Sequence, residues 1–157
     1  MILFHGTNCD FSEIDLAKTK PYKDFGKGFY LTDIQHQAYE LAKNRCRIFG
    51  GSPVVQEYEF DENLLQNRTL DVLRFDKVSV EWAEFIYKNR KSSLKFTHKH
   101  DVVIGPIADD GVAYLLNLYD DGLRTLEELA KELEYKDLNS QYCFLTLKAV
   151  SLLRRIR

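Results

Sequence analysis

Short apolar runs alternate with stretches of helical spacing along this sequence, and the alternation restricts the chain to folds that mix strands and helices. Runs of β-branched and aromatic residues, bounded by Gly, Pro or polar residues, predict strands at 2–4, 29–32, 54–60, 101–106 and 141–145. Apolar residues at helical spacing predict helices at about 34–49, 80–89, 110–119, 125–133 and 149–156. We therefore expect an α+β fold.

Polar residues at the expected helix starts indicate where the helices begin. Asp33 is positioned to cap the first long helix, which Gly50-Gly51 ends. Thr125 begins the S/T-x-x-E pattern of a capping box. The adjacent Asp109 and Asp110 are either a helix cap or a pair of catalytic carboxylates, and the cap is favoured because a helix N-terminus attracts negative charge.

The length and charge of the chain limit its organisation and its partners. A chain of 157 residues without a Pro/Ser-rich linker or internal repeat is expected to form a single domain over residues 1–157. Lys plus Arg (22) nearly balance Asp plus Glu (24), so the overall charge does not draw the protein to nucleic acid or to a membrane. The Lys-rich stretch 88–99 and the Arg-rich C-terminus are interpreted as solvated segments, the alternative being that they dock a phosphate backbone.

The cysteines and the apolar content bear on the compartment. Cys9, Cys46 and Cys143 are far apart and form no CxxC pair, so we expect reduced thiols that serve as packing residues. The first residues hold too few apolar side chains for a signal peptide, and no run of about 18 apolar residues is present. A cytoplasmic protein without membrane contact is expected.

Two short motifs give only weak indications of a metal site or a phosphate-binding loop. His98 and His100 flank Lys99 and would share one face of a strand, as metal ligands do, but no third ligand is near, so a solvated surface is favoured and no metal is expected. Gly26-Lys27-Gly28 is similar to part of a phosphate-binding loop, but no Ser or Thr follows the lysine, which excludes a nucleoside-triphosphate loop.

Two further motifs occur together. His5-Gly6-Thr7 ends the first strand, and the run 26–33, Gly-Lys-Gly-Phe-Tyr-Leu-Thr-Asp, leads into a strand and then a helix. This pairing resembles the poly-ADP-ribose polymerase and diphtheria-toxin-like branch of the ADP-ribosyltransferases. Over nearly its whole length, with the segments 105–110 and 141–146, the chain is also similar to a bacterial domain-of-unknown-function family placed in that superfamily. The resemblance implies a split mixed β-sheet core flanked by helices.

The resemblance also implies a site for NAD, which is the substrate, and no metal. His5 would bond the adenine-side ribose, and Thr7 would support it. Gly6 would bond the nicotinamide amide through its backbone, and Tyr30 would stack on the nicotinamide ring. Gly28 is part of the same binding motif.

Two positions depart from the polymerase pattern. A Ser and a second stacking Tyr of the polymerases correspond here to Ala38 and Leu41, and Tyr39 is a candidate substitute for the missing ring. Tyr30 is therefore the aromatic residue assigned to the ligand, whereas rings in apolar segments, such as those of Phe49, Phe85, Trp82 and Phe144, are assigned to the core.

The third family position, usually a Glu that opens a late strand, is Gln141 here. Gln can hold a ribose hydroxyl, but it supplies no negative charge and is no base. The predicted catalytic residues are thus His5, Tyr30 and Gln141, in a slow enzyme, an enzyme with a strongly nucleophilic acceptor, or an inactive protein. Glu132 and Glu134 precede Gln141 closely, but nothing in the sequence positions either as a substitute.

These observations lead to one function and two alternatives. The expected function is NAD-dependent mono-ADP-ribosylation of an unknown protein or nucleic-acid acceptor. The resemblance adds the role of toxin in a toxin–antitoxin pair, with a small antitoxin protein as partner. The alternatives are a catalytically inactive NAD- or nucleotide-binding pseudoenzyme and an NAD glycohydrolase.

Overall fold

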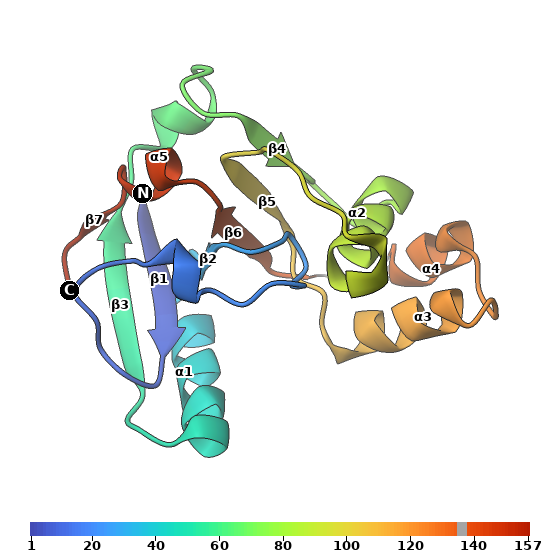
Figure 1. The fold of residues 1–157 in the computed structure, drawn as a ribbon, viewed down its shortest axis with the longest axis horizontal. Helices are drawn as coiled ribbons and strands as arrows, with labels where there is room; N and C mark the ends of the chain where they lie inside the picture. Colours follow the sequence, from blue (N-terminus) through green and yellow to red (C-terminus); the bar gives the residue numbers. More distant parts are fainter. Residues whose placement is uncertain (135–137) are drawn as a thin grey trace.

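The fold mixes strands and helices, as the sequence predicts. A computed structural model describes residues 1–134 and 138–157, and within them the chain forms seven β-strands in two sheets and five α-helices (Figure 1). None of the helices in this described part is long and apolar enough to cross a membrane. The α+β class is therefore confirmed.

The first sheet has the antiparallel order β1-β3-β7, made of β1 (Ile2–Thr7), β3 (Val54–Glu59) and β7 (Arg154–Arg155). Helix α1 (Gln35–Phe49) packs along β1 and β3 (Figure 1). The approach is close at Gly6, where a Cβ atom would overlap the carbonyl oxygen of Ala38. Gly6 therefore lets the helix lie directly against the strand.

The second sheet has the order β2-β6-β5-β4, made of β2 (Phe29–Leu31), β6 (Ser140–Phe144), β5 (Val102–Pro106) and β4 (Val72–Arg74). Strands β4 and β5 are parallel, and the other pairs are antiparallel. The two sheets meet at a bridge in which Phe4 N donates to Thr32 O (2.7 Å) and Thr32 N donates to Phe4 O (2.9 Å). The bridge places β1 beside β2.

Side chains on the two faces of the second sheet enter different cores. Val102, Ile104 and Phe144 pack toward β1 and β3, whereas Val103 and Cys143 pack toward a layer of helices. That layer contains α2 (Val80–Arg90), α3 (Asp110–Asp120) and α4 (Leu126–Leu133), which lie together on the side of the molecule away from β3 (Figure 1).

Two of the three helix caps predicted from the sequence are confirmed, and Ser79 adds a cap at a helix start for which none was predicted. Ser79, Asp109 and Thr125 accept bonds from the backbone amides three residues on and so cap α2, α3 and α4. For the Asp109-Asp110 pair, the cap interpretation is confirmed. The prediction for Asp33 is wrong, because α1 begins after Ile34 and the Asp33 carboxylate instead accepts from the Tyr142 hydroxyl (3.4 Å).

The expected C-terminal helix over 149–156 is wrong. Helix α5 spans only Leu147–Val150, and the following residues extend into β7 on the edge of β3. The guanidinium of Arg155 pairs with Asp10 at 2.6 Å, so the basic residues attach this strand rather than end a helix. Two packing expectations are also wrong, because Phe49 is 57% exposed and Cys9 is exposed.

Candidate functional site

Two adjoining cavities open where β1, β2 and α1 meet. The Gly6 cavity, of about 800 Å³, is lined by Gly6, Asp24, Tyr30, Leu41, Arg90 and Gln141 among others. The His5 cavity, of about 400 Å³, is lined by His5, Thr7, Lys23, Gly28, Tyr30 and Arg45 among others. Lys23, Tyr30 and Leu41 line both, so the two cavities form one elongated candidate site.

The sheet register brings Tyr30 and Gln141 together. Tyr30 of β2 lies opposite Cys143 of β6, and Gln141 is two residues from Cys143 along the same strand. Because side chains alternate between the faces of a sheet, Tyr30, Cys143 and Gln141 share one face. Two motif residues that are 111 positions apart in sequence therefore line the same cavity.

The backbone of Gly6 faces this cavity rather than its own sheet. Phe4 uses its N–H and C=O for the bridge to Thr32, and its partner in β3, Glu57, bonds the C-terminal segment instead. Hydrogen-bonded and non-bonded pairs alternate along an antiparallel ladder. Gly6, two residues after Phe4, therefore directs its N–H and C=O away from β3 and toward the β2 side, where a donor and an acceptor are available to a planar amide.

His5 is held neutral by its surroundings. Its Nδ1 lies 2.8 Å from the carbonyl oxygen of Tyr30, and its ring lies against Phe29 with the centroids 4.3 Å apart. Burial lowers the pKa of His5 to about 4. Since a carbonyl only accepts, Nδ1 carries the proton, and Nε2 is left as an acceptor suited to a hydroxyl group.

Tyr30 is fixed by the loop that precedes its strand. Its hydroxyl donates to Gly26 O (2.7 Å) and accepts from Phe25 N (2.9 Å). The ammonium of Lys23 lies over the ring, 5.1 Å from its centroid. Burial raises the pKa of the Tyr30 hydroxyl and lowers that of Lys23. Because Lys23 and Tyr30 both line the two cavities, the ring already has a cation beside it there.

Asp24, in the same loop, connects the loop to Gln141. Arg90 Nε donates to Asp24 Oδ1 (2.6 Å), and Gln141 Nε2 donates to Asp24 Oδ2 (3.2 Å). Each carboxylate oxygen thus has a different partner. Neither Asp24 nor Arg90 belongs to a motif predicted from the sequence; the usable signal is that Asp24 stands two residues before Gly26, at the start of the glycine motif.

The His5 cavity is rich in basic side chains, none of which is predicted as a site residue from the sequence. Lys18, Lys20, Lys23 and Arg45 all line it. Within the described part of the chain, the buried Nε of Arg45 has no hydrogen-bond partner. Arg45 follows Leu41 by four residues on α1, so helical spacing is the signal that could have placed both on one face. Glu13 and Asp15 also line the cavity, and Asp15 lies 3.7 Å from Lys18 Nζ, so basic residues outnumber acidic ones and the lining favours an anionic group.

The remaining motif residues fall in different places. Thr7 and Gly28 line the His5 cavity, and a Cβ at Gly28 would lie 2.6 Å from Cys143 Sγ, so a glycine is needed there. The structure does not bring Tyr39 to either cavity; it lines a hollow with His36 and Arg157 instead. Residues two apart on a helix point to nearly opposite sides, and Leu41, not Tyr39, faces Tyr30.

His98 and His100 have structural partners. His98 Nε2 lies 2.7 Å from Phe25 O, and His100 Nδ1 lies 2.8 Å from the carboxylate of Asp71. The expectation of a solvated surface is wrong for His98, which is half-buried and whose pKa burial lowers. Across residues 1–134 and 138–157, no cluster of three or more His, Cys, Asp or Glu is arranged to hold a metal ion.

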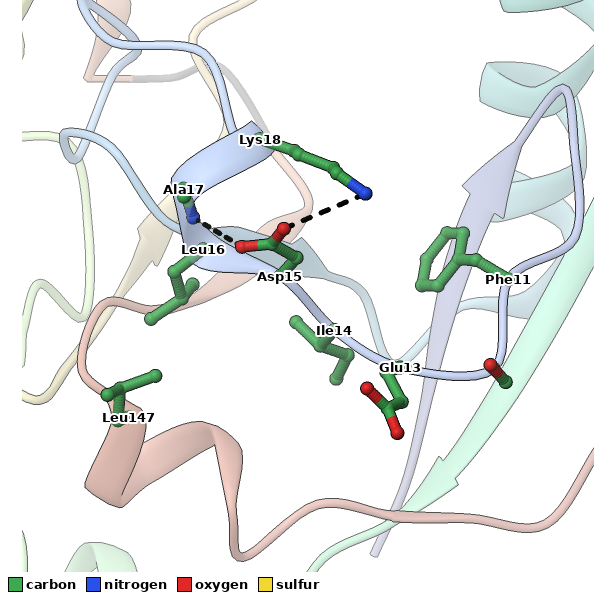
Figure 2. Close-up of a pocket in the computed structure, with 9 residues that line it drawn as sticks. Phe11, Glu13, Ile14, Asp15, Leu16, Ala17, Lys18 and Leu147 are labelled. Atoms are coloured by element: carbon green, nitrogen blue, oxygen red, sulfur yellow. Dashed lines mark hydrogen bonds and ion pairs between the residues drawn. The ribbon is translucent and has the colours of Figure 1, made fainter.

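Another hollow, next to the His5 cavity, lies between residues 11–18 and Leu147 (Figure 2). Asp15 accepts from Ala17 N (2.9 Å) and lies 3.7 Å from Lys18 Nζ, as the dashed lines in Figure 2 show. These polar groups partner one another within a short 3-10 helix, Leu16–Lys18, and its cap. The two cavities around Tyr30 are therefore the better candidate, because groups from several distant elements converge there.

Comparison with known proteins gives a family but no characterised relative. No curated protein and no solved structure matches the chain. The family model described as "Protein of unknown function (DUF3990)" matches residues 1–154, almost the whole chain. The chain therefore belongs to the DUF3990 family.

Proposed function

We propose that this protein is an NAD-dependent mono-ADP-ribosyltransferase with an ADP-ribosyltransferase-like fold. The observation that carries the proposal is the convergence of Gly6, Tyr30 and Gln141, from β1, β2 and β6, on one cavity. These are three of the residues that the family resemblance assigns to nicotinamide and its ribose. His5 and Thr7 line the adjoining cavity, on the side proposed for the rest of the dinucleotide.

The chemistry of the two cavities supports a two-lobed, charged ligand. A nicotinamide has a flat cationic ring and a carboxamide, which suit the face of Tyr30 and the outward N–H and C=O of Gly6. The ammonium of Lys23 lies over the Tyr30 ring, so on binding the pyridinium ring of nicotinamide would replace it as the cation beside Tyr30. Lys18, Lys20 and Arg45 suit the diphosphate.

The proposed reaction follows from these contacts. NAD binds with nicotinamide against Tyr30, Gln141 holds a ribose hydroxyl, and His5 Nε2 accepts from the other ribose. Departure of nicotinamide then lets an acceptor attack the ribose. On the resemblance alone, we extend the proposal to a cytoplasmic toxin restrained by a small antitoxin protein.

The test is incubation of the purified protein with NAD labelled in its adenylate phosphate, with and without a cell lysate. We expect nicotinamide release together with label on a macromolecule. Free ADP-ribose without transfer would instead identify an NAD glycohydrolase. Neither product, with NAD still bound, would identify a pseudoenzyme, and neither product without binding would refute the proposal.

A further inference from the structure

Cleavage of NAD is favoured by a negatively charged group close to the ribose, and in this site a residue other than Gln141 has to provide that charge. As the bond between ribose and nicotinamide breaks, positive charge develops on the ribose, and a nearby carboxylate stabilises that charge. Gln141 carries no charge. This inference rests on the proposed function and concerns the carboxylate that stabilises the positive charge on the ribose.

Among the described residues that line the Gly6 cavity, Asp24 and Glu40 carry carboxylates. Glu40 lies on α1 with its side chain 43% exposed and its Oε1 2.6 Å from Lys43 Nζ. Both carboxylates have a basic partner at 2.6 Å, because Arg90 pairs with Asp24, so exposure separates them: water screens the charge of Glu40. The Asp24 side chain is only 13% exposed and contacts Gln141 directly. Burial makes its charge act more strongly on a bound ligand.

The position of Asp24 is fixed from both sides. The next two residues, Phe25 and Gly26, are bonded through their backbone to the Tyr30 hydroxyl. Arg90 holds Oδ1, which leaves Oδ2 directed at the Gln141 amide. The loop, the stacking ring and the carboxylate are thus one connected assembly, as preorganised stabilisation of a transition state requires.

We propose that Asp24 is the catalytic carboxylate of this site and replaces the charge that position 141 lacks. The bond between ribose C1′ and the nicotinamide nitrogen breaks, and its electron pair leaves with neutral nicotinamide. The acceptor's oxygen or nitrogen forms the new bond to C1′, and its proton passes to Asp24 and then to solvent. Arg90 is a positioning residue that orients the carboxylate.

The test compares nicotinamide release and NAD affinity for the wild type, Asp24→Asn and the control Asp121→Asn, which alters an exposed carboxylate at the end of α3. We expect Asp24→Asn to lower kcat by about 10²–10³-fold while the Kd for NAD changes by less than about fivefold. Asp121→Asn should match the wild type. Because Asp24→Asn leaves a cation unpaired, Asp24→Asn/Arg90→Gln provides a second variant with neither charge, and the same loss is expected.

Substitution of Gln141 by Glu tests whether a carboxylate at position 141 can replace the carboxylate of Asp24. Gln141→Glu alone should give no more than a few-fold gain, because the charge is already supplied and two carboxylates would then repel. Asp24→Asn/Gln141→Glu should recover at least about tenfold over Asp24→Asn.

Three outcomes would overturn the assignment. An active wild type with an equally active Asp24→Asn would remove Asp24 from the mechanism and leave the proposed function standing. A faster Asp24→Asn would mean that Asp24 blocks the site. A wild type that neither binds NAD nor releases nicotinamide would refute the proposed function and, with it, the role of Asp24.

Discussion

The neutral, half-buried His5 makes the stability of the fold depend on pH in a defined direction. Its pKa is about 4 in the folded protein, against 6.5 for the free side chain. Between these two pH values the imidazole is protonated in the unfolded chain but neutral in the folded chain, so acid favours unfolding. The stabilisation that neutral His5 contributes is complete above about pH 6.5, decreases as the pH falls from 6.5 to about 4, and no longer changes below about pH 4.

The magnitude follows from the shift of the pKa. Between pH 7.5 and pH 4.5, linkage predicts a loss of roughly 2–3 kcal/mol in the free energy of unfolding from this one residue. The matched variant is His5→Asn, which keeps a donor for the Tyr30 carbonyl but does not titrate. His98, whose pKa burial also lowers, is present in both proteins and cancels in the comparison.

The assay is urea denaturation at pH 7.5, 6.0 and 4.5, followed by the fluorescence of Trp82, the single tryptophan, which is fully buried. The wild type should lose about 2–3 kcal/mol more than His5→Asn over this range. Parallel losses in the two proteins would refute the neutral state of His5 in the folded protein, and so would an imidazole that titrates near pH 6.5 by NMR.

The other predictions concern packing and reactivity. Gly6→Ala should destabilise the fold by at least about 2 kcal/mol, because the added Cβ overlaps a backbone oxygen of α1; an unchanged thermal midpoint would contradict that contact. Tyr30→Phe should cost about 1–3 kcal/mol and speed hydrogen exchange at the Phe25 amide, which loses its acceptor; unchanged exchange would show that the loop does not depend on this hydroxyl. In the native protein, Cys9 should react quickly with a thiol reagent, whereas Cys143 should react only on unfolding, since it is buried and burial raises its pKa; equal rates would contradict the burial.

Local patterns in the sequence were enough for most elements of the fold. The apolar runs at 29–32 and 101–106 and the helical spacing at 80–89 correspond to β2, β5 and α2 because each element buries its own periodic face. Strand β4 was missed since its three residues carry no period and are held by pairing with β5. The basic segment after α5 was mistaken for a helix because its backbone bonds go to β3, a partner that the segment itself does not specify.

The site was predictable only where one short motif contained it. Gly6 and Tyr30 were identified because each lies in a motif with a known chemistry, and Gln141 by its place in the family pattern. Asp24 and Arg90 lie 66 residues apart and meet only in the folded chain, so no spacing in the sequence relates them. Tyr39 is a candidate substitute for the missing ring because it is aromatic, whereas the phase of the helix places Leu41, which occupies the position of the family's second Tyr, at the cavity.

The central claim, that the cavities around Tyr30 bind NAD, is tested most directly by calorimetric titration of the intact protein with NAD. The matched variants are Tyr30→Leu and Tyr114→Leu, the latter at an exposed tyrosine of α3. The account predicts one site in the wild type, the same affinity in Tyr114→Leu, and affinity at least about tenfold weaker in a folded Tyr30→Leu, which loses the stacking ring. Equal affinity in all three proteins, or no binding by the wild type, would contradict it.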